Sequence, residues 1–205
     1  VLLAILMLIL LSVLIPARAE EAVSPMIVSE TANSTEYPAL EADIPVITSE
    51  GKSNVKIAGV KSKNKLVRYT IPETLLRADE NFLALMVEAE KYIGYPYVYG
   101  GSKPSTGFDC SGFVCWVFRQ SGVYDTGRLG AKGLYSLCTD VSRDEARPGD
   151  LVFFTKTMGA DVKGITHVGI YVGNGMMIHC GNPISYASIE TNYWRQHYYC
   201  MGRIR

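Results

Sequence analysis

The sequence GFDCSGFV, at residues 107–114, places Cys110 directly after Asp109. Asp is a preferred N-cap residue, so we expect a helix to begin at Cys110. Residues 113–118 are almost all apolar, which indicates a helix buried nearly all round, and Gly122 is its expected stop. A thiol in the first turn of a helix feels the positive end of the helix dipole, so we expect a lowered pKa and a reactive thiolate. Cys110 is therefore the candidate nucleophile.

Two histidines, His167 and His179, are candidates for the proton shuttle that a thiol nucleophile needs. Residues 165–172 alternate as a strand does, and residues 176–180 form the return strand after a Gly-Asn-Gly turn signal. Each histidine then lies on one strand of a β-hairpin.

The length of the hairpin loop decides whether the two rings meet. A three-residue loop with Gly175 in the left-handed conformation places Gly169 opposite His179, with His167 as a diagonal neighbour on the same face. A two-residue Asn-Gly turn would place the histidines on opposite faces. We expect the three-residue loop, with Gly169 leaving the space in which the two rings meet.

The remaining elements follow from periodicity and caps. Asp79 is the expected N-cap of a helix with one apolar stripe, which Gly94 ends. We expect the loop-rich stretch 124–144 to form one wall of the cleft. Further strands are predicted at 151–154, 184–189 and 198–204, which together with the helices gives an α+β fold class.

Three blocks of this sequence resemble the NlpC family of bacterial cell-wall cysteine peptidases. They are GYPYVYGG with FDCSGFV (94–101 and 108–114), RPGDLVFF (147–154), and ITHVGIYVGNG with IH (165–175 and 178–179). Three blocks in the right order are more specific than a lone motif. The resemblance implies a papain-like fold, in which a Cys-bearing helix packs on an antiparallel sheet bearing the histidines. It also implies cleavage of peptidoglycan stem peptides, often between D-glutamate and the diamino acid.

The resemblance assigns a role to each candidate residue, and ordinary acyl-transfer chemistry accommodates all of them. The roles are Cys110 as nucleophile, His167 as general base and acid, His179 as the third member that orients His167, Tyr97 as oxyanion donor, and Asp109 and Ser111 as substrate-binding residues.

Each of these residues also has a purely structural interpretation. Cys110 would be a small buried apolar residue, and His179 a polar residue satisfied at a strand end. Tyr97 is one of three nearby tyrosines in a region that favours strands. The N-cap alone accounts for Asp109. Their joint occurrence favours the catalytic interpretation.

Composition narrows the class of protein. The formal net charge is zero, which argues against a nucleic-acid partner. The five cysteines show no metal-ligand spacing, so we expect no metal or other cofactor. A disulfide among Cys115, Cys138, Cys180 and Cys200 stays open beside the alternative of buried thiols.

The chain divides into three parts by composition. Residues 1–19 are predicted to be a signal peptide or membrane anchor, residues 20–77 an extended tether that is first acidic and then basic, and residues 78–205 the peptidase domain. The basic stretch 52–68 is either a solvated segment with short strands or a contact for anionic wall polymers or lipid head groups.

The sequence thus predicts an exported, monomeric cysteine endopeptidase that acts outside the cytoplasm on peptidoglycan stem peptides and contacts the membrane through its N-terminal apolar segment. Three alternatives stay open. One is another acyl-transfer enzyme on the same scaffold, an amidase or a transpeptidase. The second is a wall-binding module that has lost activity, which an intact Cys110, His167 and Tyr97 disfavour. The third is an intracellular protease, which the hydrophobic N-terminus disfavours.

Overall fold

The computed structural model describes residues 46–205. The predicted signal peptide or anchor at 1–19 and the first part of the predicted tether, 20–45, lie outside the described residues. Among the residues that are described, no helix is both long and apolar enough to cross a membrane.

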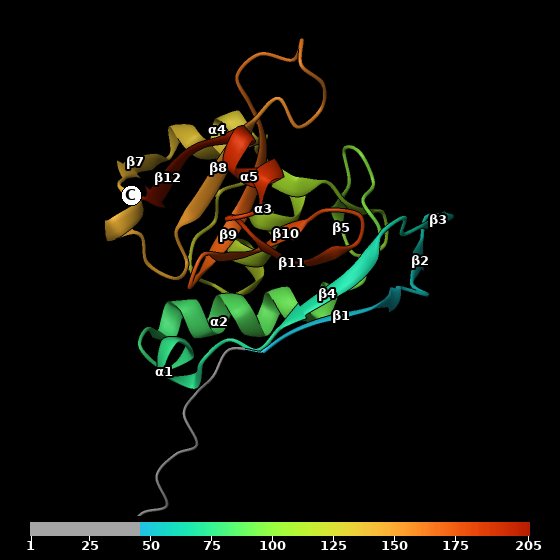
Figure 1. The fold of residues 1–205 in the computed structure, drawn as a ribbon, viewed down its shortest axis with the longest axis horizontal. Helices are drawn as coiled ribbons and strands as arrows, with labels where there is room; N and C mark the ends of the chain where they lie inside the picture. Colours follow the sequence, from blue (N-terminus) through green and yellow to red (C-terminus); the bar gives the residue numbers. More distant parts are fainter. Residues whose placement is uncertain (1–45) are drawn as a thin grey trace, which may run out of the picture. The chain divides into compact units, whose positions relative to one another are not determined.

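A six-stranded antiparallel sheet forms the centre of the domain (Figure 1). The strand order is β11-β10-β9-β8-β12-β7, so the last strand of the chain lies inside the sheet. The predicted strands all belong to this sheet. The strands are β7 (Cys138–Val141), β8 (Leu151–Thr155), β9 (Ile165–Gly173), β10 (Met176–Cys180), β11 (Ile184–Ser188) and β12 (Tyr198–Ile204).

Helix α3 (Cys110–Gln120) packs on one face of this sheet. Its residues Phe113 and Val114 are fully buried, and they share the main core with Val168 and Ile170 of β9. Every residue from Cys110 to Phe118 except Trp116 is buried, as the apolar run predicts. The α+β class and the papain-like arrangement of helix on antiparallel sheet are confirmed.

Helix α2 (Glu80–Ala89) begins where the sequence predicts, but it ends at Ala89, before the predicted stop at Gly94. Asp79 Oδ1 accepts a hydrogen bond of 3.0 Å from the backbone N–H of Phe82. A single 3-10 turn, η1 (Glu90–Tyr92), follows the helix, and Gly94 then turns the chain with a φ of +91°. The other short elements are β5 (Ser102–Lys103), β6 (Gly107–Phe108), α4 (Ala131–Ser136), η2 (Arg143–Glu145) and α5 (Asn192–His197).

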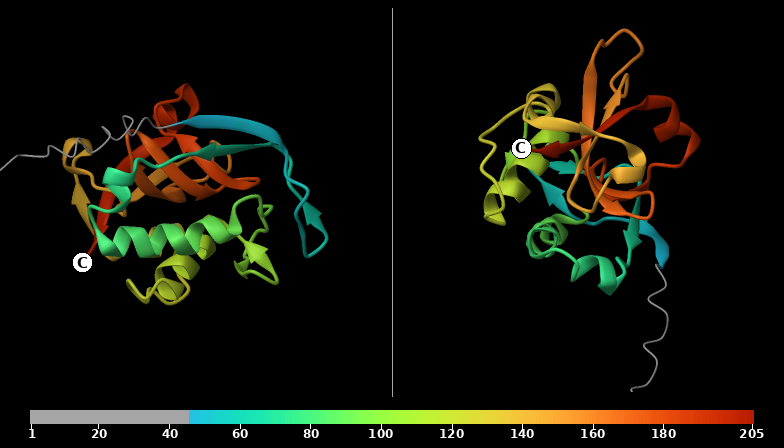
Figure 2. Two further views of the ribbon diagram at one scale, coloured as in Figure 1. Left: turned by 90° about the horizontal axis from the view of Figure 1, so that it is seen from below. Right: turned by 90° about the vertical axis from the view of Figure 1, so that its left-hand side faces the viewer.

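Residues 46–77 differ from the predicted extended tether, because they fold onto the domain. They form an antiparallel pair, β1 (Ile47–Lys52) with β4 (Lys65–Tyr69), and a small β2–β3 hairpin that projects from one end (Figures 1 and 2). The elements of this segment are β1, β2 (Lys56–Ile57), β3 (Val60–Lys61), β4 and α1 (Glu73–Leu76).

Buried apolar side chains hold this segment in place. Leu66 and Tyr69 are each 5% exposed. The Tyr69 ring packs edge-on against Tyr186 of β11, with ring centroids 5.6 Å apart. The lysines of the segment give it its positive charge, whereas burial of apolar side chains between them decides its structure.

Candidate active site

Cys110 lies at the first position of α3, and Asp109 caps the helix as predicted. Asp109 Oδ1 accepts from the backbone N–H of Gly112 at 2.7 Å and from the Ser111 hydroxyl at 2.9 Å. A Cβ at Gly112 would lie 2.1 Å from the carbonyl oxygen of Gly101, so only glycine lets the helix pack this closely on the preceding loop. The thiol is thereby held at a buried position, 6% exposed.

The pKa of the Cys110 thiol differs from the prediction. Burial first and the neighbouring Asp109 carboxylate second raise it to about 11, although the N–H groups of Val168 and of the helix start act in the opposite direction. The expected depression by the helix dipole is therefore outweighed by desolvation. The sulfur lies beside β9, with Sγ 3.9 Å from the carbonyl oxygen of Thr166.

The two histidines meet on β9 and β10. His167 Nε2 lies 2.9 Å from His179 Nδ1, within hydrogen-bond distance, and both side chains are buried. Nδ1 of His167 is then the nitrogen that remains for a thiol or a substrate. Burial lowers the pKa of His179 to about 4, and burial together with the neighbouring His179 lowers that of His167 well below its usual range. Both rings are neutral at pH 7.

Trp194 contacts both histidine rings. In the sequence it is only one of several neighbouring aromatic residues. Its ring stacks on His167 with centroids 5.2 Å apart and an interplanar angle of 29°. It also meets His179 edge-on at 5.1 Å. Trp194 comes from α5, which packs against β8, and no local pattern in the sequence connects it with the histidines.

The β9–β10 hairpin reaches the predicted register by a different turn. Met176 pairs with Gly173, so the loop has two residues, Asn174 and Gly175, both with positive φ. A bulge then shifts the register, so that Met177 pairs with Tyr171 and the histidines share a face. The predicted three-residue loop is wrong, because the extra residue lies in the strand and not in the turn.

Gly169 provides the space between the two histidine-bearing strands. A Cβ at this position would lie 2.8 Å from Met177 Sδ and 3.2 Å from both His179 Cβ and the Ile178 carbonyl oxygen. The absence of a side chain at Gly169 therefore allows β10 to bring His179 up to His167.

Tyr97 lies close to Cys110 in the fold. It forms a parallel bridge with Phe108, two residues before Cys110. Burial raises the pKa of its hydroxyl, and the charges at Cys110 and Asp109 raise it further. The phenol therefore stays protonated and can donate a hydrogen bond.

Arg128 is a residue that sequence reasoning missed. Its guanidinium lies 2.6 Å from Asp109 Oδ2 and donates to the Ser111 hydroxyl at 3.1 Å. The predicted substrate-binding pair, Asp109 and Ser111, is thus engaged with Arg128 and with the backbone of α3. Arg128 comes from the stretch 124–144, in which no sequence signal distinguishes it.

A groove of about 560 Å³ opens beside the histidine pair. His167, His179, Tyr97, Thr166 and Cys180 line it. Cys110 is not among the lining residues, but its Sγ lies 3.9 Å from the carbonyl oxygen of Thr166. The walls of the groove come from the start of β4, the β8–β9 loop, the β10–β11 loop and α5. The predicted wall at 124–144 does not line this groove. The lining residues at its rim are Asn64, Lys65, Val67, Thr157, Met158, Gly181, Asn182, Pro183, Tyr193 and Trp194.

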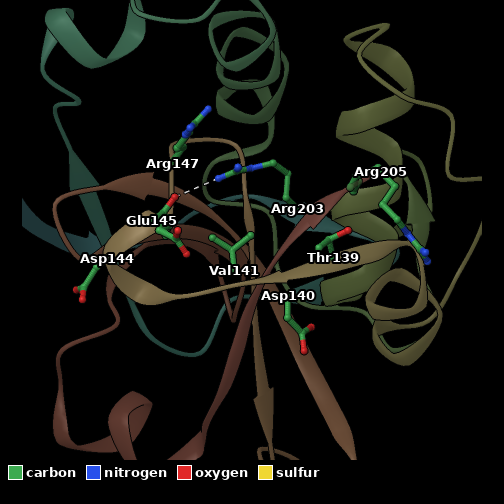
Figure 3. A pocket seen from close by; sticks show the side chains of 10 residues that line it. Thr139, Asp140, Val141, Asp144, Glu145, Arg147, Arg203 and Arg205 are labelled. Atoms are coloured by element: carbon green, nitrogen blue, oxygen red, sulfur yellow. Dashed lines mark hydrogen bonds between the residues drawn. The ribbon is translucent and has the colours of Figure 1, made fainter.

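A second cavity, of about 650 Å³, lies at the β7–β12 edge of the sheet (Figure 3). It contains neither a histidine nor a cysteine. Its central Arg203 is held by Asp150 through bonds of 2.8 Å and donates to the Glu145 carbonyl oxygen. This cavity therefore has neither a thiol nor an imidazole for the predicted chemistry. Within residues 46–205, no three His, Cys, Asp or Glu side chains are grouped so that they could hold a metal ion.

Comparisons with known proteins find similar sequences among curated endopeptidases. The chain is 47% identical over 122 residues to the bifunctional muramidase/DL-endopeptidase CwlT of Bacillus subtilis, covering 59% of this chain and 36% of CwlT. It is 46% identical over 121 residues to the probable endopeptidase p60 of Listeria seeligeri, covering 58% of this chain and 22% of that protein. The chain thus spans about a third or less of these curated relatives.

A solved structure and a family model also match the chain. The crystal structure of an NLP/P60-family protein from Staphylococcus aureus, described as similar to lipoprotein, matches with a TM-score of 0.58 and 40% identity, covering 62% of this chain and 42% of that one. The sequence model of the NlpC/P60 family matches residues 94–203, more than half of the chain and all of the candidate catalytic residues. The chain belongs to the NlpC/P60 family.

Proposed function

We propose that this protein is an exported cysteine endopeptidase that hydrolyses peptidoglycan stem peptides at the bond between D-glutamate and the diamino acid. One observation carries the proposal: a hydrogen-bonded pair of neutral histidines lines a groove, and the thiol at the start of α3 lies 3.9 Å from the carbonyl oxygen of Thr166, the residue before His167. The names of CwlT and p60 as endopeptidases support the reaction class, and the term DL-endopeptidase supports the bond.

In the first step, the Cys110 thiol gives its proton to Nδ1 of His167 while the sulfur attacks the carbonyl carbon of the substrate. A C–S bond forms and the carbonyl π electrons move to oxygen. The raised thiol pKa and the lowered histidine pKa disfavour a resting ion pair. Proton transfer therefore accompanies the attack. The hydroxyl of Tyr97 and the backbone N–H of Cys110 donate to the developing oxyanion.

In the second step, the imidazolium of His167 protonates the leaving amine and the C–N bond breaks, which leaves a thioester on Cys110. Water then attacks the thioester and gives its proton to His167, and the released thiolate recovers that proton. His179 accepts from the Nε2–H of His167 and so fixes the tautomer in which Nδ1 is basic. A neutral ring stabilises the imidazolium less than a carboxylate would.

The substrate implies the setting of the protein. Peptidoglycan lies outside the cytoplasmic membrane, so we propose an extracytoplasmic location with membrane contact through the N-terminal apolar segment 1–19. We propose that the enzyme acts as a monomer without a cofactor, because every group used above comes from one chain.

Digestion of purified peptidoglycan tests the proposal. The purified protein is compared with Cys110→Ala and His179→Ala, and the fragments are identified by mass spectrometry. We expect new amines on the diamino acid with the unaltered protein, none with Cys110→Ala, and a reduced rate with His179→Ala. Release of free lactyl groups from muramic acid would instead identify an amidase, and full activity of Cys110→Ala would end the assignment of the nucleophile.

A further inference from the structure

The groove beside the histidines carries a single formal charge. Among the described residues that line it, Lys65 is the one charged side chain, since His167 and His179 are neutral. Lys65 is exposed, and within residues 46–205 its ammonium group takes part in none of the ion pairs. A groove with one unpartnered cation favours a ligand that brings an anion to that point.

The backbone around Lys65 is held firmly, so the charge is positioned and does not merely lie on a loose surface. The N–H of Asn64 donates to the carbonyl oxygen of Asn182 at 2.9 Å, and the N–H of Lys63 donates to the Asn182 side chain at 3.3 Å. The next residue along β4, Leu66, is buried. Lys65 and Val67 both line the groove, as alternate residues of a strand do.

The neighbouring charges reinforce this positive wall. Lys65 lies directly opposite Lys52 in the β1–β4 pair, an arrangement that is destabilising for like charges. The one acid among residues 47–69 is Glu50, and Arg68 already pairs with it at 2.7 Å. The protein therefore leaves the charge on this wall unneutralised, and an anion bound in the groove would offset it.

We propose that Lys65 binds a carboxylate of the stem peptide and thereby selects stems in which that carboxylate is free. The inference rests on the proposed function, and it assigns a specificity role to a segment outside the family-matched residues 94–203. A stem peptide offers two such groups near the scissile bond, the α-carboxylate of the D-glutamyl residue and a carboxylate of the diamino acid. Amidation of either removes its charge without changing its size.

Three synthetic stem peptides test the inference: one with both carboxylates free, one with the glutamyl α-carboxylate amidated, and one with the diamino-acid carboxylate amidated. The purified protein is compared with Lys65→Gln, Lys65→Arg and the control Lys61→Gln, which removes the same charge from β3 without touching the groove. We expect kcat/KM to be about three- to fivefold higher for the free acid than for one of the amides, the upper part of the range for an exposed charge pair. That amide identifies the carboxylate that Lys65 binds.

The preference is expected to appear in KM, to shrink as NaCl is raised, to vanish in Lys65→Gln, and to persist in Lys65→Arg and Lys61→Gln. Equal cleavage of all three peptides by the unaltered protein, or an unchanged preference in Lys65→Gln, would overturn the inference and leave the proposed function standing.

If no peptide is cleaved, the proposed function fails. The role of Lys65 is then tested by measuring peptide binding. The peptides are then titrated into Cys110→Ala and into Cys110→Ala with Lys65→Gln, with the fluorescence of Trp194 in the groove as the signal. Tighter binding of the free acid that depends on Lys65 would support the inference. Absence of that dependence would overturn it together with the proposed function.

Discussion

Replacing Arg128 with Met is expected to destabilise the protein and to weaken the nucleophile, because it removes the counter-charge of Asp109. The Arg128 guanidinium lies 2.6 Å from Asp109 Oδ2 and also donates to the Ser111 hydroxyl at 3.1 Å. The Asp109 side chain is 12% exposed and that of Arg128 39% exposed. The carboxylate is therefore nearly buried, whereas its partner is partly screened by water.

The expected loss of unfolding free energy is about 2 kcal/mol. A hydrogen bond to a charged group contributes about 1.5–3 kcal/mol, and partial exposure of the arginine favours the lower part of that range. Asp109 keeps its bonds from the N–H groups of Gly112 and Gly100, so the cap of α3 persists and the loss stays moderate. The unneutralised carboxylate also raises the pKa of the Cys110 thiol further, which should lower kcat/KM.

Urea unfolding and stem-peptide hydrolysis measure the two effects, with Arg77→Met as the matched control. Arg77 pairs with Glu73 on α1, and their side chains are 75% and 60% exposed. Such an exposed pair contributes about 0.3–0.5 kcal/mol. Equal losses of unfolding free energy in Arg128→Met and Arg77→Met would refute the reasoning that burial of the acidic partner determines how much an ion pair stabilises the fold. Unchanged kcat/KM in Arg128→Met would refute the link between Asp109 and the thiol.

Two further predictions concern the histidines. Gly169→Ala is expected to cost about 1–3 kcal/mol by overpacking and to lower kcat, because the new Cβ lies 3.2 Å from His179 Cβ. The control Gly51→Ala, on the exposed strand β1 with nothing within 4 Å, should change neither, and equal effects of the two would contradict this. The free energy of unfolding should fall as pH drops from 6.5 towards 4, because the unfolded state binds a proton at His179 that the folded state does not bind. It should also fall as pH rises from 9 towards 11, because the unfolded state releases a proton from Cys110 that the folded state retains. Urea unfolding across pH checks both limbs, and an acid limb of the same size in His179→Asn would exclude His179 as its cause.

Much of the fold was predictable because its signals are local. The caps at Asp79 and Asp109 act within one helical turn, and hydrogen bonds to the N–H groups of Phe82 and Gly112 confirm them. The strands were predictable from alternation, since burial on one face imposes a period of two on the sequence. Local signals did not predict the turn of the β9–β10 hairpin. The predicted register is correct, but it arises from a two-residue turn and a bulge on β9, and not from a three-residue loop.

The candidate site divides in the same way. The residues proposed for the chemistry, Cys110, His167 and His179, were identifiable because the family motifs are short runs of neighbouring residues. The residues that surround them were not, since Arg128, Trp194 and Lys65 reach the site from distant parts of the chain. No local pattern can encode a contact that forms only when separate segments pack together.

The sequence by itself determined the two main helices, five strands of the central sheet, their buried faces and the residues proposed for the chemistry. Only the tertiary structure decided that residues 46–77 fold onto the domain, that one lysine is the sole charge in the described groove, and that the thiol pKa rises where the helix position predicted a fall. The physical reason is the same in each case: desolvation and long-range packing depend on what surrounds a residue in space, whereas caps and periodicity depend on its neighbours in the chain.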